Sequence, residues 1–214
     1  MPAIRPEPSV LRGRFIQLVP LTRDDLPELF TALADPRVYA GGYGGGPAGR
    51  QATLEAYVEW GSGYFRFDDG IVFGVRLLTG ELVGSSTLTD FDEVREHAHI
   101  GWTAYHPSVW GGPVNPEAKL LMLGLAFDHG YGRVKLQADS LNDRSRAAIL
   151  KLGATFEGIV RRDQLRPDGI WRSTAVYSIL KDEWVDVRAG LEARLAAFEG
   201  TVVTFDAAAA PHAE

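Results

Sequence analysis

The chain has 214 residues, of which 45% are hydrophobic, so we expect one domain with a sizeable core over residues 1–214. It contains no cysteine, which excludes disulfides, thiol nucleophiles and cysteine-based metal sites and fits a cytoplasmic protein. The formal net charge of −6 argues against nucleic acid as a partner, because phosphate backbones attract basic surfaces, and no apolar run is long enough to cross a membrane.

Patterns of apolar residues predict the elements of the first half of the chain. We expect a strand over 14–21, a helix opened by Thr22 and ended at Asp35–Pro36, a second helix over 51–60, and a hairpin of strands over 71–77 and 81–89. The acidic run 90–96, which leads into the next strand, is most simply a solvated turn.

The glycine-rich run AGGYGGGPAG occupies residues 40–49. It lacks the Gly-Lys-Ser/Thr that follows a nucleotide-binding phosphate loop, which excludes that interpretation. Six glycines in ten residues are typical of a mobile loop.

The segment 97–153 organises the rest of the chain. Its patterns predict, in order, a strand that ends at Pro107, a glycine turn over 110–112, a helix over 115–130, a strand over 133–139 and a helix over 142–153. Asn115 is well placed as the N-cap of the longer helix, with Pro116 at its first helical position. After this segment we expect a hairpin of strands over 156–162 and 171–180, then an amphipathic helix over 184–198 and a flexible tail over 201–214.

The glycine turn before the longer helix has the chemistry of an anion site. A helix N-terminus offers free N–H groups and the positive end of a dipole, so it attracts phosphate. The same residues also begin many helices only because they cap well, which is the simpler alternative. The backbone donors that a phosphate could use are those of Gly111, Gly112, Val114, Asn115, Glu117, Ala118 and Lys119, and the Lys119 ammonium could add a point charge.

One signature in this region is specific. Asn142, Ser145, Leu152–Gly153, Glu157–Gly158 and Arg161 look like the signature N-x-x-S…L-G-F…E-G-x-x-R. With the Ile-Gly-Trp strand and Trp-Gly turn before it, the chain resembles the GCN5-related N-acetyltransferases over about residues 10–185. Its closest resemblance is to the branch typified by ribosomal-protein N-terminal acetyltransferases.

The resemblance implies an α/β fold of the α+β type. We expect a mixed, mostly antiparallel sheet that is splayed between its two middle strands and flanked by helices, with acetyl-CoA held in the split. The core would span about 10–200. The family's usual pyrophosphate loop is Q/R-x-x-G-x-G/A, whereas this chain has Trp-Gly-Gly-Pro-Val-Asn-Pro over 110–116, so its phosphate donors differ in detail.

The resemblance also implies the cofactor contacts. The main chain of Trp102, Thr103 and Ala104 on the central strand would bind the thioester and pantetheine. Asn142 and Ser145 would lie near the sulfur, where the Ser145 hydroxyl could protonate the departing thiolate; the alternative is that both only cap their helix. Arg144 and Arg146 flank Ser145, and one of them could reach the 3′-phosphate or face water.

The general base is less clear in this sequence. Many members of the family carry Glu-Ile-Gly in the central strand, and this chain has His99-Ile100-Gly101. A histidine titrates near neutral pH and could take the amine proton, or it could be a strand residue without a catalytic role. His97 is on the same strand face, but the sequence supplies no third ligand, so we expect no metal.

Two functions follow from the resemblance. The first is an acetyl-CoA-dependent N-acetyltransferase that acts on the amine of a protein N-terminus or of a small molecule. The second is a non-catalytic acyl-CoA-binding sensor on the same fold. In the first, the glycine-rich run 40–49 would be a lid beside the acceptor pocket. The family often forms homodimers, which the resemblance therefore also implies here.

Overall fold

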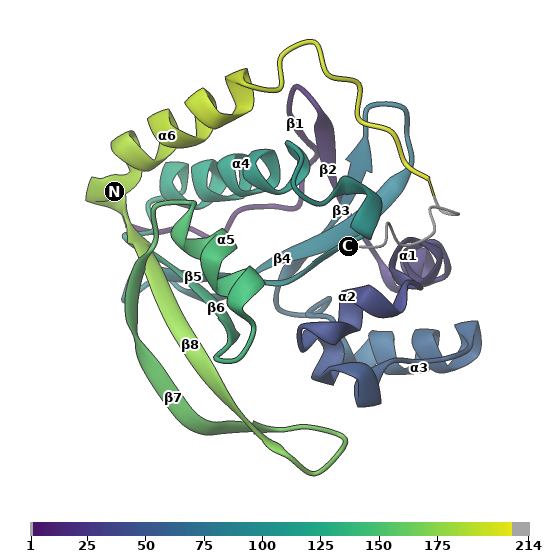
Figure 1. Cartoon of the computed structure of the whole chain (residues 1–214). Helices are drawn as coiled ribbons and strands as arrows, with labels where there is room; N and C mark the ends of the chain where they lie inside the picture. The colour runs from purple at the N-terminus through teal and green to yellow at the C-terminus, as the bar shows by residue number, and fades with distance from the viewer. Residues whose placement is uncertain (1, 207–214) are drawn as a thin grey trace.

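An eight-stranded open sheet forms the centre of the molecule, with the strand order β1-β2-β3-β4-β5-β6-β8-β7 (Figure 1). The computed structural model describes residues 2–206. The strands are Leu11–Arg12 (β1), Ile16–Pro20 (β2), Ile71–Leu77 (β3), Leu82–Asp92 (β4), His97–Tyr105 (β5), Arg133–Asp139 (β6), Thr155–Leu165 (β7) and Trp171–Leu180 (β8). Neighbouring strands in the described sheet are antiparallel except β5 and β6.

Helices cover both faces of this sheet (Figure 1). They are Leu26–Leu33 (α1), Pro36–Ala40 (α2), Leu54–Tyr64 (α3), Val114–Asp128 (α4), Asp143–Leu150 (α5) and Trp184–Ala196 (α6). Buried apolar residues of α4 and α6 form one core cluster with the sheet, and those of α1 and α3 form a second cluster with it. The fold is therefore a single mixed α/β domain, as the sequence predicted.

The two middle strands separate partway along their length. Pairing of β5 with β6 extends only from His97 opposite Arg133 to Ile100 opposite Leu136. Beyond Ile100 the two strands diverge, so the edge of β5 that faces β6 has no strand partner. Next to this point, Trp102 has φ 49°, and the register of β4 against β5 shifts between Ser85 and Thr87. This β-bulge bends β5 away from β6 and confirms the expected split.

Most predicted elements are present, with shifted ends. The strands over 71–77, 133–139 and 171–180 have the predicted bounds. Helix α4 begins at Val114 rather than after an Asn115 cap, and Pro36 begins the short helix α2 as well as ending α1. The predicted helix over 51–60 instead begins at Leu54, because the Thr53 hydroxyl caps it by accepting the Ala56 N–H at 3.2 Å.

The chain after α6 packs against the domain as far as it is described. Val203 and Phe205 contact the first core cluster, and the Phe205 ring meets His106 edge-on at 4.9 Å between centroids. The sequence did not predict this contact. The rest of the predicted flexible tail, residues 207–214, lies outside the described residues. Within residues 2–206, no helix is long and apolar enough to cross a membrane.

Candidate active site

A cavity of about 410 Å³ opens where β5 and β6 separate. Leu136 and Gln137, which are neighbours on β6 and point to opposite faces of the sheet, both line it. Ile149 of α5 contributes from the face that carries α4, and Tyr43 contributes from the glycine-rich segment beside α3. The cavity therefore passes through the sheet at the split and connects its two faces.

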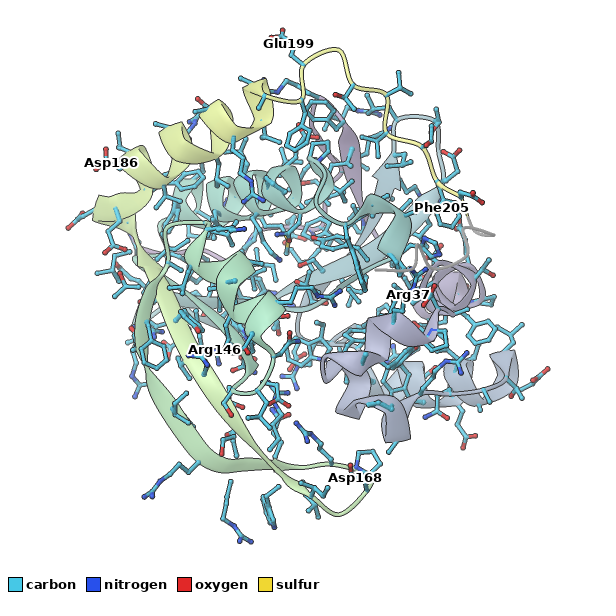
Figure 2. All side chains as sticks on the ribbon, viewed as in Figure 1. Arg37, Arg146, Asp168, Asp186, Glu199 and Phe205 are labelled. Atoms are coloured by element: carbon cyan, nitrogen blue, oxygen red, sulfur yellow. The ribbon has the colours of Figure 1, made fainter. Side chains whose placement is uncertain are left out.

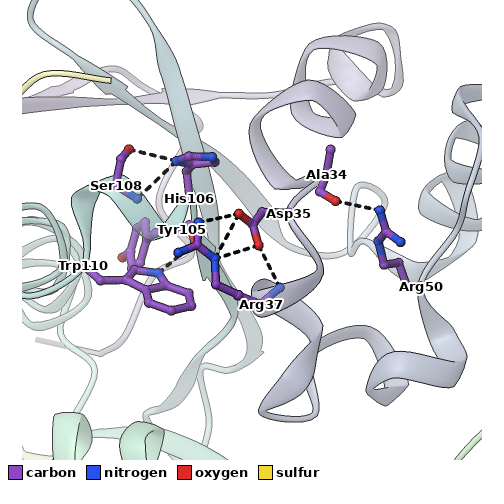
Figure 3. A network of polar contacts seen from close by, with 8 residues as sticks. All are labelled: Ala34, Asp35, Arg37, Arg50, Tyr105, His106, Ser108 and Trp110. Carbon is purple, nitrogen blue, oxygen red and sulfur yellow. Dashed lines mark hydrogen bonds and ion pairs between the residues drawn. The ribbon is translucent and has the colours of Figure 1, made fainter. Parts of the chain in front are cut away.

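One end of the cavity is the glycine turn before α4. The Trp110 indole donates to the Tyr105 carbonyl at 2.9 Å, which ties this turn to the end of β5 (Figure 3). Gly111 has φ +74°, a left-handed conformation that favours glycine, and Gly111, Gly112 and Asn115 all line the cavity. The first N–H groups of α4 have no partner within the helix, so this end of the cavity is suited to an anion.

The charges around the cavity have one sign. Its lining includes four cationic side chains and, among the described residues, no Asp or Glu. The cations are Lys119 of α4, Arg144 of α5, Lys151 after α5, and Arg194 of α6. Because the whole chain carries a net charge of −6, this local excess of positive charge favours a polyanionic ligand.

Lys119 is the most unusual of these cations because it is only 4% exposed. Its ammonium donates to the Ser86 hydroxyl at 2.9 Å and to the Thr103 hydroxyl at 2.8 Å, and these hydroxyls lie 2.7 Å from each other. No carboxylate of the described chain pairs with it. Burial therefore lowers the pKa of Lys119 from 10.5 to about 7.

On the opposite face of the sheet, His99 forms a pair with Asp90. His99 Nδ1 lies 2.9 Å from Asp90 Oδ2, and His99 is 1% exposed. The hydrogen bond to His99 lowers the pKa of Asp90 to about 2, so Asp90 is a carboxylate that accepts and Nδ1 carries the proton. Burial lowers the pKa of His99, although Asp90 opposes that shift, so the ring is neutral at pH 7 with its Nε2 lone pair free.

The His99 ring lies over the start of the split. A Cβ on Gly101 would lie 2.9 Å from His99 Nε2, so the ring occupies the space that a side chain at position 101 would need. Nε2 is buried and, among the described residues, has no hydrogen-bond partner. The buried hydroxyls of Thr87 and Thr89, opposite Gly101 and His99 in β4, also have none among those residues. Unsatisfied polar groups at one place are typical of a functional site.

A second cavity, of about 210 Å³, adjoins the first, and Asn142 lines both. It lies between the glycine-rich segment and the turn of the β7–β8 hairpin, where Asp168 stands near the tip (Figure 2). Asp139 at the end of β6 lines it and pairs with Arg166. The Asn142 amide donates to the Gly41 carbonyl, and a Cβ on Gly45 would lie 2.9 Å from Pro167, so the glycine-rich segment lies against the cap of α5 and against the hairpin turn.

Comparison with known proteins identifies the family. Residues 16–155 match the model of the acetyltransferase (GNAT) domain. The chain belongs to the GNAT acetyltransferase family. No curated protein gives a significant match to its sequence.

Solved structures of GNAT proteins share the fold. A protein from T. thermophilus assigned as an acetyltransferase is 33% identical, with 90% of this chain and 100% of that chain covered and a TM-score of 0.78. A GCN5-related N-acetyltransferase from Brucella melitensis is 28% identical, with 91% and 88% covered and a TM-score of 0.79. Mycobacterium smegmatis RimJ in complex with CoA-disulfide is 21% identical, with 87% and 95% covered and a TM-score of 0.72, which is a likeness of fold.

GNAT enzymes use acetyl-CoA, and the residues predicted to bind it fall into two groups. Those that line the main cavity are Trp102, Thr103, Ala104, Gly111, Gly112, Asn115, Lys119, Asn142 and Ser145. The Asn142 side chain accepts the Ser145 N–H at 3.0 Å, so Asn142 is also the N-cap of α5. The Ser145 hydroxyl makes no hydrogen bond to the described residues.

The other predicted residues have different contacts. The Glu117 carboxylate accepts the N–H groups of Arg14, Phe15 and Ile16 at 2.6, 2.7 and 2.9 Å, and its own N–H donates to Pro113 within the helix. Glu117 therefore anchors the start of β2 rather than a phosphate.

Val114, Ala118 and Arg146 also do not line the main cavity. Val114 and Ala118 are 0% exposed and belong to the core. Arg146 donates to the Tyr177 hydroxyl and to the Ser140 carbonyl, each at 3.1 Å, on the β8 side of α5 (Figure 2). Its neighbour Arg144 takes the place at the cavity instead, with its guanidinium 3.6 Å from the centre of the Trp110 ring.

Asp90, Lys151 and Arg194 are functional candidates that the sequence did not indicate. The sequence predicts a solvated turn over the acidic run 90–96, whereas the structure extends β4 through Asp92 and pairs Asp90 with His99. Among the described residues, no three acidic or histidine side chains are grouped as a metal site would need.

Proposed function

We propose that this GNAT protein is an N-acetyltransferase, which moves the acetyl group of acetyl-CoA to an amine. The observation that carries the proposal is the Asp90–His99 pair at the start of the split, with a neutral imidazole and a free Nε2. An amine must lose a proton to become an amide, so a base at this position suits N-acetylation.

The main cavity suits acetyl-CoA. Four basic side chains, with no carboxylate of the described chain beside them in the lining, suit the phosphates, and the glycine turn before α4 suits the pyrophosphate. The strand edge of β5 beyond Ile100 offers backbone groups to the amides of the pantetheine arm. Trp102, Thr103 and Ala104 lie on this edge and line the cavity.

The reaction then needs few groups from the protein. The amine nitrogen forms a bond to the acetyl carbon, and the carbon–sulfur bond breaks. His99 Nε2 takes the amine proton, directly or through one water, while the Asp90 carboxylate holds Nδ1–H and stabilises the imidazolium. The Ser145 hydroxyl donates a hydrogen bond to the departing thiolate.

We infer that the acceptor amine enters from the second cavity. Asn142 lines both cavities. The second one is lined by the Asp139–Arg166 ion pair and by Asp168, which has no ion-pair partner among the described residues and can attract a cationic amine. Two acceptor classes remain in the proposal, protein N-termini and small-molecule amines. The signature of the ribosomal-protein branch favours a protein N-terminus, and the fold likeness to RimJ is consistent with it.

A thiol-release assay tests the proposal. The protein is mixed with acetyl-CoA and with either peptides that have a free α-amine or small diamines, and free CoA is measured over time. Steady CoA production with either class, and acetylated product by mass spectrometry, would support N-acetylation. Binding of acetyl-CoA without turnover on any amine would favour the non-catalytic sensor. The expected homodimer stays a prediction that light scattering can check.

A further inference from the structure

Arg194 stands apart from the other cations of the cavity because it comes from the C-terminal helix. Helix α6 lies outside residues 16–155, the part of the chain that matches the family model. The Arg194 side chain nevertheless lines the main cavity. Its Nη1 is buried and has no hydrogen-bond partner among residues 2–206, which is costly for a charged donor.

The packing of α6 fixes which end of the cavity Arg194 reaches. Helices α4 and α6 lie side by side (Figure 1), and the Trp184 ring at the start of α6 meets the Phe127 ring at the end of α4, 5.3 Å between centroids. The helices are therefore antiparallel. An α-helix rises about 1.5 Å per residue, so Arg194 lies roughly 15 Å along α6 from Trp184. The same length measured back along α4 from Phe127 reaches the first turn of α4. Arg194 thus lies at the α4 N-terminus, beside the glycine turn.

We propose that Arg194 binds a phosphate of acetyl-CoA, so that α6 forms one wall of the cofactor site. This inference rests on the proposed function, because it takes the anion to be acetyl-CoA. A guanidinium offers a planar fork of donors that matches a phosphate, and among residues 2–206 no carboxylate lines this cavity to compete for it. The position beside the glycine turn assigns it to the pyrophosphate rather than to the 3′-phosphate.

The test is calorimetric titration of CoA into the wild type, Arg194→Gln and Arg194→Lys. The matched control is Arg188→Gln, because Arg188 lies on the same helix, is 61% exposed and pairs with Glu192. We expect Arg194→Gln to weaken CoA binding about 10- to 100-fold, the range for a lost charge-assisted hydrogen bond. We expect a smaller loss for Arg194→Lys, which keeps the charge, and no change for Arg188→Gln.

Two further ligands separate a phosphate contact from an indirect effect. Dephospho-CoA, which lacks the 3′-phosphate, should show the same loss with Arg194→Gln; a loss confined to CoA would overturn the pyrophosphate assignment in favour of the 3′-phosphate. Acetyl-pantetheine, which has no phosphate, should bind all variants equally. If its binding falls as much as that of CoA, the role of Arg194 is structural and the inference fails.

The inference and the proposed function can fail separately. If the wild type binds CoA and Arg194→Gln binds it within twofold, Arg194 makes no phosphate contact while the acetyl-CoA assignment survives. If the wild type does not bind CoA at all, the proposed function itself is overturned. If Arg194→Gln has a much lower melting temperature than the wild type without ligand, Arg194→Lys is used as the test variant instead. Unchanged CoA binding by folded Arg194→Lys then overturns the inference.

Discussion

His99 and Asp90 form a hydrogen-bonded pair, 2.9 Å from Nδ1 to Oδ2, at the point where β5 leaves β6. The carboxylate selects the tautomer of the ring, because it accepts the Nδ1 proton and leaves Nε2 as a lone pair. The ring itself lies over Gly101, the first residue of the split. His99 therefore presents an unpaired acceptor that is buried next to Gly101, which lines the cavity, while His99 itself does not line it.

The first prediction concerns the pH profile. Burial lowers the pKa of His99 below 6.5, so the acidic limb of kcat/KM should lie below pH 6.5, with activity present above it and lost as His99 protonates. His99→Asn should lower kcat/KM by about 10²–10⁴-fold and remove this limb. Initial rates between pH 5 and 9 measure both effects. An unchanged limb in the variant would assign the proton to another group.

The second prediction separates positioning from chemistry. Asp90→Asn should lower kcat, because the amide no longer fixes the Nδ1 tautomer, and should leave acetyl-CoA affinity unchanged. Since Asp90 raises the pKa of His99, the acidic limb should also move to lower pH in this variant. A merely structural role for Asp90 would lower the melting temperature without moving the limb. Lys135→Gln is the control of opposite sign: Lys135 contacts Asp90 at 3.3 Å and its charge lowers the pKa of His99, so this variant should move the limb to higher pH.

Lys119 gives a prediction about stability and pH. Its folded pKa of about 7 lies below its ordinary 10.5, so below pH 7 both states are protonated and the folded state bears the full cost of a buried charge. Between pH 7 and 10.5 the unfolded state binds more protons, and stability rises with pH. Lys119→Met should therefore stabilise the protein at pH 6, by at most roughly 5 kcal/mol, and less at pH 9.5. Urea unfolding at both pH values measures the difference.

The same measurement would also show whether the Lys119 ammonium stabilises its contacts with Ser86 and Thr103. The Ser86 and Thr103 hydroxyls remain hydrogen-bonded to each other at 2.7 Å when the ammonium is removed, so the variant leaves no buried hydroxyl unpaired there. A destabilised Lys119→Met at pH 6 would mean that the ammonium is stabilising despite its burial. The protein would then carry Lys119 as a structural residue and not as a charge kept for an anionic ligand.

The glycine turn provides a matched pair of variants. A Cβ on Gly112 would meet only the Val109 carbonyl, at 3.5 Å, and its backbone is not left-handed, so Gly112→Val should fold normally. It should nevertheless weaken CoA binding at least tenfold by blocking the approach of a phosphate to the backbone. Gly111→Val should in addition lower the melting temperature, because φ +74° is strained for valine. Equal CoA binding by Gly112→Val and wild type would exclude the turn as the phosphate site.

The sequence predicts the fold and one wall of the site well, because the signals there are local. The strand over 133–139 and the Asn142 cap depend on neighbouring residues, and both are found as predicted. Asp90 was missed since its partner His99 is reached only through strand pairing, and a run of acidic residues looks the same in a solvated turn. Arg194 was missed because a helix pattern marks the buried face but not which polar residue meets a distant cavity.

Three of the predicted phosphate donors, Val114, Glu117 and Ala118, do not line the cavity, for a related reason. A helix N-terminus has several N–H groups, and the sequence cannot assign where the first intrahelical bond forms. Here the Glu117 N–H already donates to Pro113, and the Glu117 side chain binds the N–H groups that begin β2. The buried Glu117 side chain thus links the start of α4 to the start of β2, two segments that are about a hundred residues apart in the chain.

The last prediction concerns Ser145, for which the structure separates two roles that the sequence leaves together. Asn142 is the cap of α5, and it accepts the backbone N–H of Ser145, not its hydroxyl. Ser145→Ala therefore keeps the capping bond and should not change the melting temperature. Asn142→Ala removes that bond and should cost about 1 kcal/mol of unfolding free energy.

If the Ser145 hydroxyl assists the departing thiolate, Ser145→Ala should lower kcat roughly a hundredfold while acetyl-CoA affinity stays close to that of the wild type. Weaker binding with normal kcat at saturation would make the hydroxyl a uniform binding contact instead. The thiol-release assay with saturating acetyl-CoA and calorimetric titration of CoA distinguish the two. An alanine variant with unchanged kcat and unchanged affinity would show that the hydroxyl has no part in the reaction, and a hydrogen bond from another donor would then have to stabilise the thiolate.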